Sequence, residues 1–450
     1  MATEVALINK SSGDRVFYST YAAARAAASM GDKIQIWANL TNQQILLKDR
    51  VDVWIAPGRI IDMGLAMPTI QDDGSVICNI YGYGIIKNSY NPSSTGDHYE
   101  CIRITNSDSK VSIQCDYIEG IGRVYNSEIY ANEGYSIFIE GLYSTQSFRL
   151  QCNKVLNKNN SAIVFRDYDA GTPENEVNIN VKTVQSGISG VSGSGRTAVE
   201  LAGKGFVNIN EIICPVKGSC LVHTGGNIFA NIIKLTTYDS SEPAVWVGDG
   251  DESQDLKLYF NEIKNLNTTS GDAVKVTQGI VNIIGRKIYS SKGLSLDLKE
   301  DIVSAFFQCN EIISGTKGIN IYNYSKAIII QANFIEGSNG HYGVIYCFVR
   351  TNLVLRNAKI KNTSTSASTP YSICIYIYAG SFEQFFKFEN VTIVTGNTST
   401  GETLYLPVTG AEDPIVQNLG LFLNKYFGSA VNLQVGTAAN FKYIQSSDVS

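Results

Sequence analysis

The feature that most constrains this chain is a pattern of eight columns that recurs at least eleven times along its 450 residues. The third column is apolar in every copy, and the eighth is always isoleucine or valine. Side chains branched at Cβ favour strands, so each copy is predicted to form a strand that stacks on its neighbours. The copies cover residues 111–118, 148–155, 177–184, 205–212, 226–233, 256–263, 281–288, 305–312, 328–335, 353–360 and 386–393.

The phase of the pattern predicts a bend inside each copy. Columns one, three and five point inward at the period of two that a strand requires, but inward column eight breaks that period. The chain must therefore turn at columns six and seven. Asparagine tolerates the left-handed conformation and bonds locally, which suits such a turn. Column six holds Asp116 in the first copy and later Asn153, Asn210, Asn231, Asn261, Asn310 and Asn333.

A shorter motif follows each copy after a loop of variable length. It reads small residue, apolar, any, apolar, as in Ser136–Ile139, Ala198–Leu201 and Ala273–Val276. The copies are spaced 21 to 37 residues apart, as expected of a solenoid. We predict an all-β fold, a single-stranded parallel β-helix that is right-handed by the crossover rule. A leucine-rich repeat is disfavoured because no helical stretch separates the strands.

The two ends of the chain depart from the repeat. Tyr21–Gly31 is rich in alanine, with Ser19 or Thr20 to cap its start, and predicts a short helix. We expect this helix to cover the open end of the coil, with partner binding as the alternative. Residues 1–33 would be the N-terminal segment and capping helix, residues 34–410 the β-helix, and residues 411–450 a C-terminal cap or oligomerisation segment.

Composition narrows the class of protein. Charged residues make up 17% of the chain, and no basic run with interleaved aromatics is present, which argues against nucleic acid binding. No run is apolar and long enough to span a membrane, and none at the start resembles a signal peptide. The nine cysteines lack metal-ligand spacing, and several fall in inward columns. They predict buried structural thiols of a protein made in a reducing cytoplasm, with no metal and no cofactor.

The step from Gly31-Asp32-Lys33-Ile34 into stacked rungs resembles the start of pectin-lyase-like β-helix proteins. The asparagine-rich bend resembles the asparagine ladder of that superfamily, over roughly residues 17–410. Within it, the chain looks most like a tailspike or fibre of a tailed bacteriophage. That resemblance implies a virion protein and a homotrimer, with other virion proteins as partners. Such proteins bind, and sometimes cleave, bacterial surface glycans.

The outward position of the shorter motif bears on association. Four apolar residues there, Phe138, Val164, Val222 and Trp246, would form a strip down one face. Exposed apolar patches usually mark interfaces, so the strip predicts a subunit contact. The alternative is that loops of the same chain fold over it. The other outward positions are predicted to be Glu200, Lys275, Ser295, Asn320, Ile345, Cys374 and Tyr405.

Catalytic candidates come from two acidic loops. Glycan hydrolysis uses two carboxylates roughly 5 to 10 Å apart, and neighbouring rungs could supply them. Solvated loop charges are the alternative, and Ca²⁺ binding is a third interpretation. The candidates are Asp167, Asp169 and Glu174 in one loop and Asp249 and Asp251 in the other.

The three histidines offer no metal-ligand spacing. His98 and His341 fall in predicted loops, and His223 falls in an inward column as a core residue. Signatures of the polygalacturonases and pectate lyases of the superfamily are absent.

Two functions remain in competition. The first is a structural virion protein of tailspike, fibre or decoration type, located in the virion, that contacts host glycan. The alternative is a polysaccharide depolymerase, a hydrolase or lyase that uses acidic residues in a groove of the β-helix. The sequence favours the first, and a bacterial surface adhesin is a third interpretation.

Overall fold

The chain is a parallel β-solenoid with one short helix near its N-terminus, as the repeat predicts. In this computed structural model each turn contributes to a sheet of long strands, the long sheet, and to a sheet of short strands, the short sheet. The structure describes residues 5–90, 99–106, 108–122, 134–141, 146–167, 176–188, 196–216, 218–238, 240–248, 254–299, 301–316, 318–322, 327–338, 343–348, 352–364, 375–378, 385–394, 402–406, 415–423, 432–435 and 442–445.

The chain divides into two compact units. Unit 1 comprises residues 1–238 and 250–252. Its short sheet contains β5 (Ile45–Leu46), β8 (Ile70–Gln71), β11 (Ile102–Ile104), β13 (Ile137–Gly141), β15 (Ile163–Asp167), β17 (Val199–Leu201) and β19 (Leu221–His223). Its long sheet contains β1 (Val5–Ile8), β2 (Arg15–Tyr18), β3 (Lys33–Ile36), β4 (Leu40–Thr41), β6 (Asp52–Ile55), β7 (Ile60–Asp62), β9 (Ile77–Gly82), β10 (Ile85–Asn88), β12 (Lys110–Gly120), β14 (Ser147–Asn157), β16 (Glu176–Ser186), β18 (Lys204–Cys214) and β20 (Gly226–Thr237).

Unit 2 comprises residues 239–249 and 253–450 and repeats the same two sheets. Its short sheet contains β21 (Val245–Val247), β23 (Val274–Val276), β25 (Leu296–Leu298), β27 (Ile319–Tyr322), β29 (Ile345–Phe348), β32 (Ile375–Tyr378), β34 (Glu402–Leu406) and β36 (Asn432–Val435). Its long sheet contains β22 (Gln254–Asn265), β24 (Gly279–Ser290), β26 (Ile302–Ser314), β28 (Ile328–Gly337), β30 (Asn352–Arg356), β31 (Lys359–Asn362), β33 (Phe385–Val394), β35 (Ile415–Leu423) and β37 (Lys442–Gln445).

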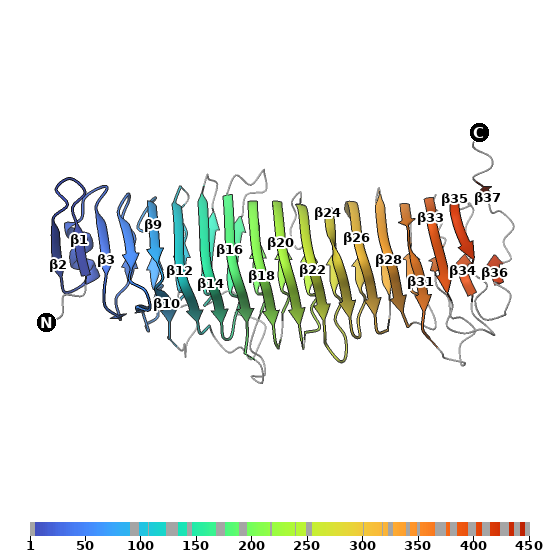
Figure 1. Ribbon diagram of the computed structural model, residues 1–450, viewed down its shortest axis with the longest axis horizontal. Coiled ribbons are helices and arrows are strands. Elements are labelled where there is room, and N and C mark those ends of the chain that lie inside the picture. Colours follow the sequence, from blue (N-terminus) through green and yellow to red (C-terminus); the bar gives the residue numbers. More distant parts are fainter. Residues whose placement is uncertain are drawn as a thin grey trace. The chain divides into compact units, whose positions relative to one another are not determined.

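The bend lies where the column pattern predicts it. Cys115 pairs with Cys152 and Tyr117 with Lys154, whereas Asp116 and Asn153 between them have no ladder partner. The Asn153 side chain instead donates a hydrogen bond to Asp116 Oδ1 across 2.6 Å. In the earlier turns the bend divides the rung into separate strands, so β12 pairs with β9 before its bend and with β10 after it (Figure 1).

In one copy of the long-strand pattern, residues 226–233, the observed register differs from the predicted columns by two residues. Gly205 pairs with Ile228 and Ile212 with Leu235, so Ile233 occupies the bend and is 49% exposed instead of buried. The true column six of this copy is therefore Ile233, not Asn231. A slip of two residues keeps every apolar side chain on the inner face, so the period of two could not reveal it.

Slips in register also affect three copies of the shorter motif, by two residues in the copies at 293–296 and 372–375 and by one residue in the copy at 343–346. Leu296, Ile345 and Ile375 are the inward residues that pair with Val274, Ile319 and Ile345 respectively. The outward positions are therefore Asp297, Tyr346 and Tyr376, in place of the predicted Ser295, Ile345 and Cys374.

The N-terminal end combines the predicted helix with a hairpin that the sequence did not reveal. Helix α1 (Tyr21–Ala27) is capped by Thr20, whose hydroxyl accepts from Ala23 N, and it ends before Gly31. Strands β1 and β2 form an antiparallel hairpin, and β1 pairs antiparallel with β3. Because β3 pairs with β6 on its other side, the hairpin covers the edge of the first parallel strand.

Parallel pairing continues past residue 410, where the column pattern lapses. Strand β35 pairs with β33 over eight positions, and β37 pairs with β35. Among the described residues, the inward columns of both units are mostly apolar and buried, and all eight described cysteines are buried free thiols. Within the described residues, no helix is long and apolar enough to cross a lipid bilayer.

Candidate functional site

The five predicted catalytic residues lie almost wholly outside the described part of the chain. Asp169, Glu174, Asp249 and Asp251 are not among the described residues. Asp167 is the last residue of β15, and its backbone pairs with Gly141 of β13. The acidic-loop hypothesis therefore stays a prediction. His98, His341 and Cys374 also lie outside the described residues.

His223 is a buried core residue, as its inward column predicts. Its Nδ1 lies 3.3 Å from the carbonyl oxygen of Leu201, and its Nε2 lies 3.2 Å from that of Gly226. Burial lowers the pKa of His223 to about 4, although both carbonyl contacts act to raise it. The ring is therefore neutral near pH 7, and its side chain has no access to a ligand.

The predicted apolar strip is not an exposed surface in unit 1. Phe138, Val164 and Val222 are 6%, 0% and 5% exposed. Tyr135 stacks on Phe138 with ring centroids 5.3 Å apart, and Tyr135, Phe138 and Val164 form a buried cluster. These three strip residues therefore pack within the chain, which agrees with the alternative that parts of the same chain cover the strip; the subunit contact stays a prediction.

Two arginines complete the cover of this cluster. The guanidinium of Arg103 lies 5.0 Å from the centre of the Phe138 ring, and that of Arg166 lies 5.6 Å from the centre of the Tyr135 ring. Arg166 Nε also pairs with Glu200 Oε1 at 2.9 Å. Stacking of cations on the rings explains how outward aromatic side chains lose their contact with water.

A different column of unit 1 does face solvent. Gln114, Gln151, Asn180, Asn208 and Asn231 are directly in register on β12, β14, β16, β18 and β20 of the long sheet (Figure 1). We call these five residues the amide ladder. Gln114 is partly buried and the other four are exposed. Because rungs stack at ~4.8 Å, the ladder extends over about 19 Å.

The amides of the ladder are free for a ligand. Stacked amides can bond to one another along a sheet, yet within the described part of the chain none of these five side chains bonds to the protein. Asparagine is also disfavoured in strands. Neither packing nor strand formation therefore explains five consecutive amides. Each presents one carbonyl acceptor and two N–H donors to solvent.

One of the two columns that flank the ladder is nearly neutral, whereas the bend column on its other side includes Asp116 and the exposed Lys182. The neighbouring outward column reads Ser112, Arg149, Asn178, Phe206 and Phe229, with one charge among the five. A face with more amides than charged groups, rich in paired donors and acceptors, suits a hydroxyl-rich ligand. The sequence contained this signal, because the fourth column of the first four copies reads Gln, Gln, Asn, Asn. The fold signal lies in the inward columns, whereas the amides lie in an outward column that packing does not constrain.

The fourth strip residue, Trp246, belongs to a polar cluster in unit 2. Lys275 Nζ lies 4.6 Å from the centre of the Trp246 ring, in the next rung of the short sheet. One rung further, Asp297 pairs with Lys299 at 3.1 Å and accepts a hydrogen bond from Asn320 Nδ2 at 3.0 Å. The partly buried Trp246 is thus covered on one ring face by a cation, so here too the strip is not bare.

Asp272 is the one carboxyl group of this cluster with a strongly raised pKa. Burial raises its pKa to about 6, and the charge of Asp297 adds to the rise. A hydrogen bond from Leu294 N and the charges of Lys299 and Lys275 oppose it. Near pH 6 Asp272 can therefore hold or release a proton close to the ion pair of Asp297 and Lys299. The sequence did not single out either residue, and the slip in register hid Asp297.

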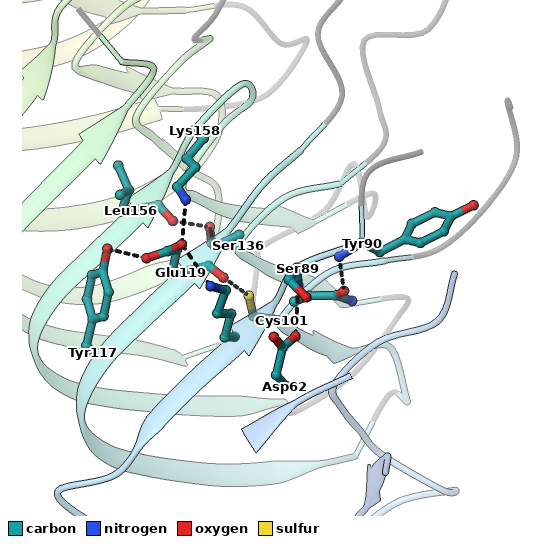
Figure 2. A network of polar contacts seen from close by, with 12 residues as sticks. Asp62, Ser89, Tyr90, Cys101, Tyr117, Glu119, Ser136, Leu156 and Lys158 are labelled. Atoms are coloured by element: carbon teal, nitrogen blue, oxygen red, sulfur yellow. Dashed lines mark hydrogen bonds and ion pairs between the residues drawn. The ribbon is translucent and has the colours of Figure 1, made fainter. Parts of the chain in front are cut away.

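A polar network in unit 1 surrounds Glu119 and lowers the pKa of its carboxyl group, in contrast to the raised pKa of Asp272 (Figure 2). The Glu119 carboxylate contacts Lys158 Nζ at 2.7 Å and Lys87 Nζ at 3.5 Å and accepts from Tyr117 Oη at 2.9 Å. Burial acts to raise the pKa of Glu119, but the bonds to Lys158 and Tyr117 and the lysine charges outweigh it and lower the pKa. The carboxylate is fully engaged, so we interpret this network as structural.

No cluster of ligands suggests a bound metal in the described residues, where groups of three or more histidine, cysteine, aspartate and glutamate side chains do not converge. Comparison of the chain with protein-family models, curated proteins and solved structures found no match.

Proposed function

We propose that this chain is a bacteriophage virion protein of the tailspike or fibre type, which contacts host surface glycan through the amide ladder of unit 1. The observation that carries the proposal is the run of exposed, unbonded amides on consecutive rungs. The pectin-lyase-like resemblance of the sequence and its solenoid fold support the class of protein. The partners in this proposal are two further copies of the chain, other virion proteins and the glycan.

The geometry suits a linear polymer of sugars. The amides repeat with the rungs, so a polysaccharide laid along the ladder meets the same donor and acceptor groups at each step. The sheet holds the side chains on a rigid backbone, which limits the entropy lost on binding.

The test is binding of capsule or lipopolysaccharide fragments from candidate host bacteria, measured by calorimetry. We expect the triple substitution Gln151→Ala, Asn180→Ala and Asn208→Ala to weaken binding by about tenfold or more, because each amide contributes hydrogen bonds worth about 0.5–1.5 kcal/mol. The control is Asn261→Ala with Asn310→Ala, two exposed amides at bends in unit 2. Equal loss in both variants, or no loss in the triple variant, would contradict the proposal.

Cleavage of the glycan is the second candidate function, favoured by the raised pKa of Asp272 beside Asp297. In this proposal the protonated Asp272 donates its proton to the leaving oxygen of the glycosidic bond, while a water molecule attacks the anomeric carbon and releases a proton to solvent.

The experiment for cleavage follows products released from a glycan that the protein binds. New reducing ends would indicate hydrolysis, and absorbance of an unsaturated sugar would indicate elimination. We expect release by the unaltered protein and none by Asp272→Asn, which keeps an oxygen to accept from Leu294 N. A bound glycan that stays intact would exclude the enzyme and leave the binding protein.

A further inference from the structure

Four cations lie on the outer face of the long sheet in unit 1, on the rungs that carry the amide ladder. Lys110, Arg149, Lys182 and Lys204 come from four consecutive strands of that sheet, β12, β14, β16 and β18. All four side chains are exposed, and none forms an ion pair, a hydrogen bond or a ring contact in the part of the chain that the structure describes. Their charges are therefore available to a ligand.

Other cations of unit 1 are engaged by carboxylates. Lys87 and Lys158 contact Glu119, and Arg166 pairs with Glu200. The chain as a whole is acidic, with a net charge of -5. Unpaired cations gathered on one face of an acidic chain are a local feature of that face, and a local field of this kind attracts ligands of the opposite charge.

Two carboxylates on the same face offset the four cations only in part. Between the start of each long strand and its bend, the four rungs carry the four cations together with Asp116 and Glu176, and four positive with two negative charges leave a net charge of +2. Asp116 Oδ1 is occupied by a hydrogen bond from Asn153 Nδ2 at 2.6 Å. Glu176 is in register with Lys204 but forms no ion pair with it. The face therefore stays positive.

Arg149 and Lys182 flank the ladder directly. Arg149 lies two residues before Gln151 on β14, and Lys182 lies two residues after Asn180 on β16. Gln151 and Asn180 are themselves paired in register. Because residues two apart on a strand are separated by about 7 Å, one cation stands on each side of the two amides, with roughly 13 Å between the two cationic positions along the strand. A ligand laid on Gln151 and Asn180 is thus within reach of both long cationic side chains.

The chemistry of these groups identifies the ligand as an acidic sugar polymer. A guanidinium binds a carboxylate through two parallel hydrogen bonds, and an ammonium group binds it as a point charge. The amides between the cations offer donors and acceptors to hydroxyl groups. A neutral glycan would leave both cations without a counter-charge, whereas a glycan that contains uronic or sialic acid complements the charges and the amides together.

A nucleic acid fits this face less well. Double-stranded DNA carries one negative charge per about 1.7 Å of helix axis, and the proteins that bind it neutralise several phosphates at once. A net charge of +2 spread over four rungs is too sparse for that task. Widely spaced carboxylates on a hydroxyl-rich polymer match the spacing of the cations better.

We propose that unit 1 selects acidic over neutral glycans, with Arg149 and Lys182 binding carboxylates of uronic or sialic acid residues while the amide ladder binds the hydroxyl groups. Lys110 and Lys204 add to the positive field from the column beyond. This inference rests on the proposed function and names the class of glycan that the ladder binds.

The experiment compares one polysaccharide in two forms. The host polysaccharide that the protein binds is used as isolated and after chemical reduction of its carboxyl groups to alcohols, which keeps the sugars and removes the charge. Calorimetry should show that the unaltered protein binds the acidic form about tenfold more tightly than the reduced form. Raising the salt concentration should weaken binding of the acidic form alone, because salt screens exposed charges.

Variants assign this preference to the two cations. Arg149→Gln with Lys182→Gln should bind both forms of the polysaccharide equally, at about the affinity of the unaltered protein for the reduced form. Arg149→Lys with Lys182→Arg keeps the charges and should keep the preference. The matched control is Lys292→Gln with Lys359→Gln, two exposed lysines of unit 2, which should leave the preference unchanged. Circular dichroism and the melting temperature verify the fold of each variant.

The outcomes separate the selectivity from the function. Loss of the preference in the glutamine pair alone supports the inference. Equal affinity of the unaltered protein for both forms, or a bound glycan that has no carboxylates, overturns it and leaves glycan binding by the amides. Equally tight binding of a DNA oligonucleotide overturns the choice of a glycan. If the glutamine pair changes the mass in light scattering and keeps the preference, the cations form an interface between copies and the inference is overturned. No binding of any glycan by the unaltered protein overturns the proposed function itself.

Discussion

Single residues show how burial decides chemistry in this solenoid. Both ring nitrogens of His223 face carbonyl oxygens, yet a neutral ring can donate only one hydrogen bond. A charged ring could donate two, but the cost of desolvating it is larger and lowers its pKa. Desolvation also acts on the thiols, since burial raises the pKa of Cys78 to about 12 and that of Cys309 to about 11. Such thiols are poor nucleophiles, which agrees with their structural interpretation.

Because the pKa of the buried His223 is lowered, we expect the folded protein to lose stability in mild acid. Its pKa is about 4 when folded and about 6.5 when unfolded, so the unfolded chain binds the extra proton between these values. The free energy of unfolding should therefore fall as the pH drops from about 6.5 to 4, by up to roughly 3 kcal/mol. Urea unfolding of the native protein and of His223→Gln, compared over this range, isolates the contribution. The difference between the two should change with pH, and a constant difference would refute it.

The sequence predicted the existence of most strands and of the helix, but it predicted their register and contacts less well. The long strands, their bend and the N-terminal helix followed from the eight columns and from a capped alanine run. Register was harder, because moving Ile233 from column eight to the bend leaves an apolar residue in every inward column. The hairpin β1–β2 was missed because its two strands lie outside the repeat. The amide ladder was readable in column four, whereas the arginine cover of Phe138 depends on contacts between distant turns.

Gly205 lies where strand β18 leaves no room for a side chain. Gly205→Ala should lower the free energy of unfolding by about 2–4 kcal/mol, because the new methyl group overlaps Val177 O and φ is positive. Gly74→Ala is the control, since Gly74 also has a positive φ, of +78°, but no atom lies near its Cβ position. We expect about 1 kcal/mol there. Chemical denaturation measures both, and equal costs would show that the close approach to β16 is unimportant.

At the scale of the whole molecule, the structure changes where subunits could meet. The resemblance to tailspikes implies a homotrimer, and the sequence placed the contact on the strip of Phe138, Val164, Val222 and Trp246. The first three are buried within one chain, so they add little apolar surface to an interface. We still expect light scattering to give about three times the chain mass of 49.1 kDa, and a monomer at micromolar concentration would argue against the trimer.

Substitution of Phe138 distinguishes a role in the stability of one chain from a role in the assembly of subunits. Its ring packs against both Tyr135 and Arg103, so Phe138→Ala should cost about 3 kcal/mol of folding free energy through the cavity it leaves. Because the ring is 6% exposed, the mass in light scattering should not change. The comparison is Val303→Ala, which removes an exposed apolar side chain and should alter neither quantity by much. If Phe138→Ala instead dissociates the assembly while each chain stays folded, the strip is a subunit contact after all, and the ring must be buried by a partner as well as by its own chain.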